Sequence, residues 1–112
     1  MKVAISLDAN AGWESPVSFR FARAPFFAIV EIKNNKATNL QIIPNPNAMG
    51  RGGVGPAVAN WLASMGVTMA IGPRAGPNAM MAMNSLGIQF RSVPPGVPLR
   101  QALASAGFSC GE

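Results

Sequence analysis

Four of the six arginines in this chain lie in glycine-bearing or loop-like segments, where their side chains are best placed to do chemistry. These arginines are Arg20, Arg23, Arg51 and Arg74. A guanidinium presents a planar fork of N–H donors, which fits a carboxylate, a phosphate or a charged inorganic cluster. The residue types therefore predict a site that binds an anion.

Two glycine-bearing turns, at residues 50–55 and 72–76, each lead into a segment with helical spacing. Unpaired amides at the two helix starts would add positive partial charge to the site, with Gly52 and Gly53 before one helix and Gly76 before the other. Neither turn is a phosphate loop, because no Gly-Lys-Ser/Thr follows it. Glycines before helices also serve as simple turn formers, so both interpretations stay open.

The elements that must position these residues are predicted from apolar periodicity and from the glycines and prolines between apolar runs. The order is βββαβαβα, with strands at 2–7, 26–32, 37–43, 67–71 and 88–93 and helices at 54–65, 77–86 and 99–106. Right-handed crossovers make the later strands parallel to the first, and the hairpin makes the second strand antiparallel. The loops 8–25, 44–55, 72–77 and 93–98 then meet at the carboxyl edge of the sheet, where open α/β sheets bind ligands. Lys2, Lys33 and Lys36 fall at the opposite end.

The composition predicts a single folded domain over residues 1–112 that binds and does not catalyse. The chain is 49% hydrophobic, only 12% charged and carries a net charge of +5, which favours anionic partners. It has no histidine and no tyrosine, and its four carboxylates are scattered. One cysteine cannot form an internal disulfide, which favours the cytoplasm. The longest apolar stretch, near residues 24–30, is too short to span a membrane.

Other chemically useful side chains have less specific interpretations. Trp13 and Phe19 in the first loop are expected either to cover a ligand or to cap the core, and we favour the core. Cys110 is a soft metal ligand by type, but we expect it at the end of the sheet away from the arginines. Methionines are expected to fill the core at Met65, Met69 and Met83 and to be exposed, as a partner surface, at Met80 and Met81.

Three segments together resemble the dinitrogenase iron-molybdenum cofactor biosynthesis family. They are Ser-Phe-Arg-Phe-Ala-Arg-Ala-Pro-Phe-Phe at 18–27, Gly-Arg-Gly-Gly-Val-Gly at 50–55 and Ile-Gly-Pro-Arg-Ala-Gly-Pro-Asn-Ala at 71–79. The resemblance covers essentially the whole chain. It implies a ribonuclease-H-like, three-layer fold with a five-stranded mixed sheet in the order 3-2-1-4-5, and it adds Asn78 to the candidate site.

The resemblance also implies that the ligand is an iron-molybdenum cofactor or an iron–sulfur precursor cluster. Family members often carry histidine in the first and second segments, whereas this chain has Arg20 and Arg51 there, and Ala22 replaces a usual glycine. A protonated guanidinium cannot coordinate iron or molybdenum as imidazole does. The metal ligands are therefore not assigned, and charge pairing with an anionic cluster takes their place.

The leading hypothesis is a cluster carrier or accessory protein, with cofactor-biosynthesis or acceptor proteins as its partners. The second is a small-anion or regulatory module that has lost cluster ligation. The third is nucleic-acid binding, which ranks last because few aromatic residues lie near the arginines.

Overall fold

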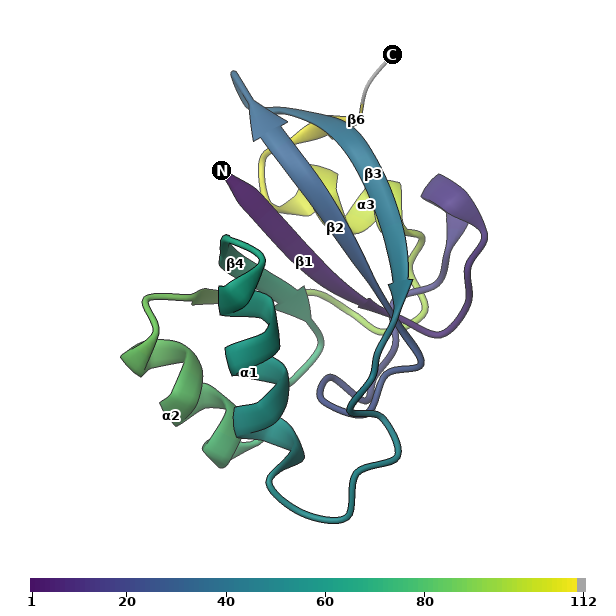
Figure 1. Cartoon of the computed structure of the whole chain (residues 1–112). Coiled ribbons are helices and arrows are strands. Elements are labelled where there is room, and N and C mark those ends of the chain that lie inside the picture. The colour runs from purple at the N-terminus through teal and green to yellow at the C-terminus, as the bar shows by residue number, and fades with distance from the viewer. Residues whose placement is uncertain (111–112) are drawn as a thin grey trace.

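The computed structural model describes residues 1–110 as one mixed sheet with helices on both faces (Figure 1). The strands are β1 (Lys2–Leu7), β2 (Phe26–Lys33), β3 (Lys36–Pro44), β4 (Val67–Gly72), β5 (Gln89–Ser92) and β6 (Ser109–Cys110). The helices are η1 (Gly12–Glu14), a 3-10 turn, and α1 (Val54–Ser64), α2 (Pro77–Ser85) and α3 (Leu99–Ser105). Every predicted strand and helix is present, and each boundary lies within one residue of its predicted position.

The sheet has six strands, in the order β5-β4-β1-β2-β3-β6, and the prediction of five was wrong. The first five strands lie side by side in the predicted order, 3-2-1-4-5. Strand β2 is antiparallel to β1 and β3, whereas β4 lies parallel to β1 and β5 parallel to β4. The additional strand, β6, lies parallel to the start of β3 through Lys36–Ser109 and Ala37–Cys110. Only two residues long, it has no periodicity that could have revealed it.

Two apolar cores cover the two faces of the sheet, so the domain has three layers. On one face, α1 and α2 pack through Val58, Leu62 and Met83 onto Phe27 and its neighbours. On the other face, α3 packs through a stripe of buried side chains against the opposite sides of β1, β2 and β4. Alternate residues of β1 therefore enter different cores, which is why its burial is almost continuous.

The helices end as predicted, each at a glycine with positive φ: Gly66, Gly87 and Gly107. Met83 and Met69 are buried, Met65 packs against the core and Met81 is exposed, in agreement with the prediction. Met80 differs, because it is half-buried against the same core. Leu86, expected on the inward stripe of α2, is 40% exposed because the helix has already ended at Ser85. No helix in residues 1–110 is long and apolar enough to cross a membrane.

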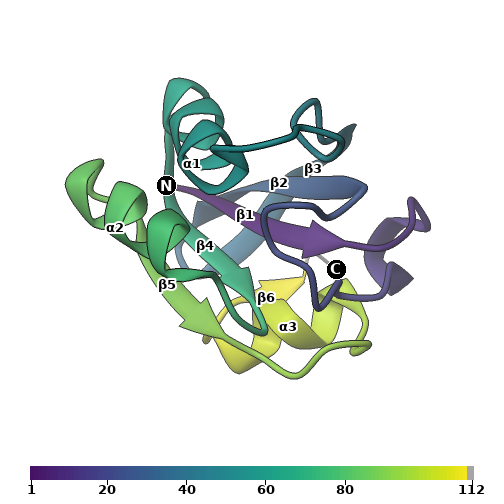
Figure 2. The same ribbon diagram turned by 90° about the horizontal axis from the view of Figure 1, so that it is seen from below.

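The loops predicted to gather at one edge do so, as the view from below shows (Figure 2). Leu7 at the end of β1 pairs with Phe26, which in turn pairs with Pro44 at the end of β3. The amide of Val17 donates to the carbonyl of Val97 at 2.9 Å, which joins the first loop to the last. We call this region, formed by residues 8–25, 44–53, 72–76 and 93–98, the arginine edge.

Candidate functional site

The loop that carries Arg20 and Arg23 is anchored by Phe21, which lies between them. Phe21 is buried and makes edge-to-face contacts with Phe27 and Phe90, with ring centroids 5.2 and 5.4 Å apart. Its ring also covers the end of β4, because a β-carbon on Gly72 would lie 3.0 Å from Phe21 Cδ1. Aromatic packing thus holds this loop next to the segment that carries Arg74.

Asn45 ties the same loop to the segment that follows β3. Its Nδ2 donates to the carbonyls of Ala22 and Ala24 at 2.8 and 2.9 Å, and its Oδ1 accepts from the Asn47 amide at 2.9 Å. Asn45 is 7% exposed, so these bonds are shielded from water and satisfy a buried amide. The two loops are therefore fixed to each other through main-chain atoms.

Arg23 makes a second connection between these two loops. Its Nη1 donates to the carbonyl oxygen of Ala48 at 3.2 Å and to that of Gly50 at 2.8 Å. Arg23 was predicted as an anion ligand. In the structure, its Nη1 also stabilises the loop by binding two main-chain carbonyls. The contact places Arg51, the next residue after Gly50, beside the loop of Arg20 and Arg23.

The first turns of α1 and α2 are in direct contact at the arginine edge. A β-carbon on Gly55 would lie 2.9 Å from the amide nitrogen of Ala79, so only glycine allows this approach. Neither helix has a side-chain cap, and Gly53, which precedes α1, adopts a left-handed conformation with φ of +64°. Two helix starts with their partial positive charges thus lie side by side, as the glycine turns predicted.

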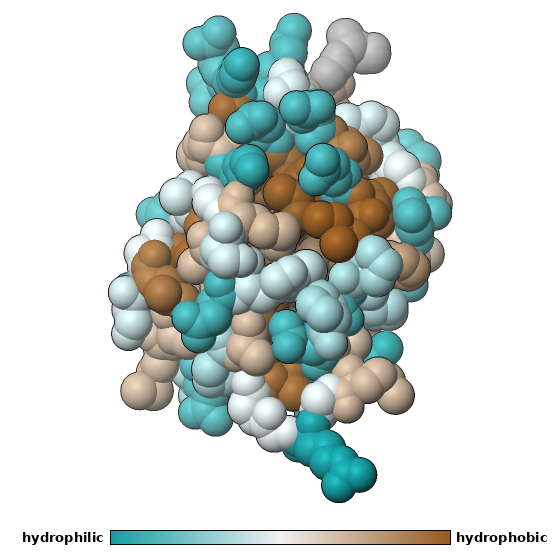
Figure 3. Space-filling view, in the orientation of Figure 1, coloured by the Kyte–Doolittle hydropathy of each residue, from teal (hydrophilic) through white to brown (hydrophobic). Residues whose placement is uncertain are grey.

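The three other predicted arginines keep their guanidiniums exposed. Arg20 lies over the ring of Phe19, 5.9 Å from its centroid, while Arg51 and Arg74 extend from their turns. Within residues 1–110, these three guanidiniums donate no hydrogen bond to a protein atom and join no ion pair. In Figure 3 a strongly hydrophilic side chain projects from the lower end of the molecule, where the loop after β3 lies. The edge, which also contains Asp8 and Glu14, therefore carries a net positive charge.

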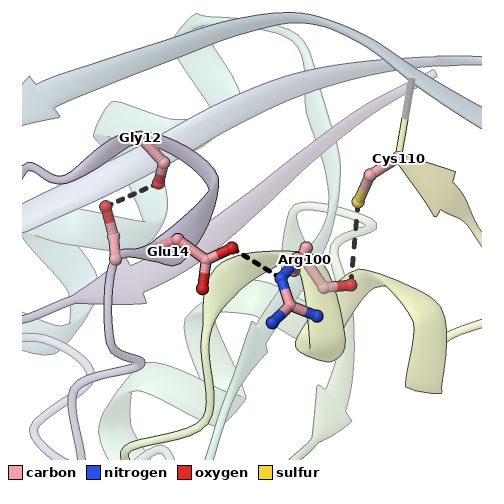
Figure 4. A network of polar contacts seen from close by, with 5 residues as sticks. Gly12, Glu14, Arg100 and Cys110 are labelled. Atoms are coloured by element: carbon pink, nitrogen blue, oxygen red, sulfur yellow. Dashed lines mark hydrogen bonds and ion pairs between the residues drawn. The ribbon is translucent and has the colours of Figure 1, made fainter. Parts of the chain in front are cut away.

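A further arginine, Arg100, starts α3 near the same edge but is neutralised. Its Nε donates to Glu14 Oε2 at 2.6 Å, which joins α3 to η1 (Figure 4). This hydrogen bond and the charge of Glu14 raise the pKa of Arg100 above its usual value. Both side chains are more than half exposed, so the pair adds little stability. Arg100 is thereby distinguished from the arginines that remain free.

The remaining predicted site residues, Gly52, Gly53, Gly76 and Asn78, are all exposed on these turns. Gly52 and Gly76 have ordinary φ values, and a β-carbon on either would meet no atom within 4 Å. The fold itself therefore does not require glycine at these two positions. Close approach of a bound group to the main chain is a separate reason for glycine there.

Three residues of the edge were missed in the sequence, namely Phe21, Asn45 and Met49. Met49 is 92% exposed at the tip between Ala48 and Gly50, and only its position in a polar turn could have indicated this. Trp13 packs against the core of the α3 face, as favoured, whereas Phe19 is 64% exposed and does not cap the core.

Cys110 lies on β6 beside the start of β3, at the end of the sheet away from the four predicted site arginines, as expected. Its Sγ contacts the carbonyl oxygen of Arg100 at 3.6 Å (Figure 4). Burial raises the pKa of this thiol, although the charge of Arg100 partly opposes the effect. Glu112, the terminal carboxylate considered in the sequence, lies outside the described residues.

A hollow of about 80 Å³ also lies away from the arginine edge, on the face of β2 and β3 that α1 leaves open. It is lined by Lys2, Ile29, Glu31, Asn39 and Gln41. Lys2 already donates to the carbonyl of Met65 at 3.1 Å, and the lining contains one positive and one negative side chain, Lys2 and Glu31. Apolar surface gathers over these two strands in Figure 3. The hollow shares no residue with the arginine edge.

The donors at the edge fit a ligand held by charge and N–H groups. In residues 1–110 no three residues among histidine, cysteine, aspartate and glutamate are grouped to hold a metal ion. The whole sequence contains no histidine. The arrangement can therefore bind an anion, or an anionic cluster through its outer atoms, without coordinating the metal by imidazole, thiolate or carboxylate.

The fold and this edge define a small α/β domain of three layers, with its candidate site on loops at the carboxyl ends of parallel strands. The chain belongs to the dinitrogenase iron-molybdenum cofactor family, whose model matches residues 1–107. It is 39% identical to an uncharacterized protein of Methanocaldococcus jannaschii over 88 residues, which are 79% of this chain and 70% of that protein. The sequence resemblance is thus confirmed.

Solved structures agree with this assignment. A Thermotoga protein, provisionally named a NifB protein, is 30% identical with a TM-score of 0.77, over 94% of this chain and 85% of that one. The apo form of the orange protein from Desulfovibrio gigas has a TM-score of 0.84 at 24% identity, over 94% and 85% of the two chains. At that identity, the second likeness supports the fold alone.

Proposed function

We propose that this protein is a carrier or accessory protein that binds an anionic metallocluster, an iron-molybdenum cofactor or an iron–sulfur precursor, at the arginine edge. Membership of the family supports a role in the biosynthesis or binding of that cofactor. The observation that carries the proposal is the joining of three arginine-bearing loops by Phe21, Asn45 and Arg23, while Arg20, Arg51 and Arg74 stay free.

The proposed role is binding without catalysis. The chain lacks histidine and tyrosine, and Asp8, Glu14 and Glu31 do not converge in the structure. Arginine donors and helix-start amides hold negative charge but do not transfer protons near neutral pH. The proposed partners are the proteins that supply the cluster to this domain or receive it.

The direct test is retention of a cluster. The purified protein is mixed without oxygen with iron–sulfur or iron-molybdenum precursors and desalted, and the metal that stays bound is measured. We expect metal to be retained by the wild type and to be reduced in Arg51→Ala and Arg74→Ala, but not in Lys36→Ala, which removes one charge at the opposite end. No metal on the wild-type protein would refute cluster binding.

A second candidate function is a module that binds a small anion, because the histidines expected from the family resemblance are missing. A thermal-shift screen with phosphates and carboxylates distinguishes the two, since a ligand selective for the folded state raises the melting temperature. Stabilisation by such anions, with no retained cluster, would favour the second function.

A further inference from the structure

Arg23 uses one side of its guanidinium to hold the segment Asn45–Gly53. The nitrogen Nη1 carries two protons, and the two carbonyls at 3.2 and 2.8 Å take one each. These carbonyls belong to Ala48 and Gly50, on either side of the exposed Met49. The tip is otherwise closed by turn hydrogen bonds of 3.3 and 3.1 Å from the amides of Ala48 and Gly50. Arg23 therefore contributes much of the order of this tip.

The other side of the same guanidinium is free. An arginine side chain has five N–H donors in a rigid plane, and Nε and Nη2 form a second fork that faces away from Nη1. In the part of the chain that the structure describes, neither of these nitrogens donates a hydrogen bond. This fork can donate hydrogen bonds to two outer atoms of an anion without releasing Ala48 or Gly50.

We propose that Arg23 is shared between the segment and the ligand, so that binding of an anion at the arginine edge and ordering of Asn45–Gly53 strengthen each other. The inference rests on the proposed function and specifies how its site is regulated. A guanidinium already held by two carbonyls loses less freedom when it binds an anion. By reciprocity, an anion on the free fork makes the contacts to Ala48 and Gly50 more persistent.

Because of this coupling, the exposed tip around Met49 is more ordered in the anion-bound protein than in the free protein. Met49 is 92% exposed and lies between the two carbonyls that Arg23 holds. When an anion occupies the site, this side chain is presented from a more rigid tip. Binding of an anion at the site thereby changes the order of an exposed segment that other proteins can contact.

The test is amide hydrogen exchange, followed residue by residue by NMR with and without tetrathiomolybdate, a diamagnetic dianion with sulfur as its outer atoms. In the wild type, we expect saturating tetrathiomolybdate to slow exchange at Ala48 and Gly50 at least threefold. Arg23→Lys keeps the charge but lacks the fork, so exchange at these amides should be faster in the free protein and should not slow on binding. Arg91→Lys, at an exposed arginine of β5, is the matched control and should behave as wild type.

Melting temperatures measured on the same samples separate the two proposals. If tetrathiomolybdate raises the melting temperature of the wild type but leaves exchange at Ala48 and Gly50 unchanged, the coupling is wrong and anion binding stands. Retention of the slowing in Arg23→Lys would also overturn the coupling, because the fork would then be unnecessary. If neither quantity changes, both proposals fail for this class of anion.

Discussion

Gly55 and Ala79 bring the first turns of α1 and α2 so close that a β-carbon on Gly55 would lie 2.9 Å from the Ala79 amide nitrogen. The atoms in conflict belong to the main chain of a helix, which cannot move as the tip of a flexible side chain can. We expect Gly55→Ala to lower the free energy of unfolding by about 1–3 kcal/mol, the usual cost of overpacking. Urea denaturation measures this change, and a stability equal to that of the wild type would contradict the contact.

Gly52 and Gly76 should respond in the opposite way. Neither has a positive φ, and a β-carbon added at either position would have no neighbour within 4 Å, so alanine is tolerated there. Gly52→Ala and Gly76→Ala should leave stability unchanged or raise it by up to about 1 kcal/mol. We expect both to weaken tetrathiomolybdate binding, because the added methyl groups would stand in the space of the proposed site. Titration calorimetry and urea denaturation together would show whether binding and stability separate.

Arg51 and Arg74 should contribute to binding and not to folding, because both are exposed and hold no protein acceptor among the described residues. Each alanine variant should weaken anion binding roughly threefold to tenfold, since one exposed charge-assisted contact contributes about 1 kcal/mol. The loss should shrink as salt is added. Affinity measured by calorimetry at two salt concentrations checks this, with Lys36→Ala as the control. Equal affinities in all three variants would remove these arginines from the site.

Asn45 should be costly to replace, because it holds two loops of the edge together. Asn45→Ala removes three hydrogen bonds and leaves the part-buried carbonyl of Ala22 and the buried carbonyl of Ala24 without this donor. We expect a loss of about 2–4 kcal/mol in the free energy of unfolding. Asn60→Ala provides the comparison, because Asn60 is exposed and makes one bond within α1. Similar urea midpoints for the two variants would show that Asn45 does not hold the loops.

The Cys110 thiol should ionise at higher pH in the folded protein than in the unfolded chain, because burial raises its pKa more than Arg100 lowers it. Its contribution to stability is therefore complete below the pKa of the unfolded thiol and is lost as the pH rises through the folded pKa. Alkylation by iodoacetamide reports the thiolate, and this chain has a single cysteine. The pH midpoint of labelling should be higher for native than for urea-unfolded protein; coincident midpoints would be inconsistent with burial of the thiol.

The general fold could be predicted from the sequence because apolar spacing, glycines and prolines agree along most of the chain. Val58 and Leu62 have helical spacing, and Val3, Ile5 and Leu7 alternate as in a strand. The pairing of Ser109 and Cys110 with β3 could not be predicted, because it joins residues more than 70 positions apart through main-chain hydrogen bonds. The exposure of Phe19 was missed because Phe21 takes the place in the core.

The candidate site could be predicted as a set of loops and arginines, but not in its internal contacts. The edge follows from strand direction, which the hairpin and the crossovers determine. The roles of Arg23 and Asn45 depend on carbonyl oxygens of Ala22, Ala48 and Gly50. Every residue type has such an oxygen, so the sequence contains no signal for which carbonyl is bound. Side-chain identity thus indicated the chemistry, and only the structure showed which arginine also supports the loops.

The bonds from Asn45 and Arg23 end on main-chain oxygens, and this has a consequence for how the site can evolve. Substitutions at Arg20, Arg51 or Arg74 leave those oxygens in place, so the framework of the edge survives a change in the groups that face the ligand. Exchange of arginine for histidine at these positions is therefore expected to change the chemistry of the edge at little cost to folding. The shape of the edge and its ligand specificity thus depend on different residues and can change independently.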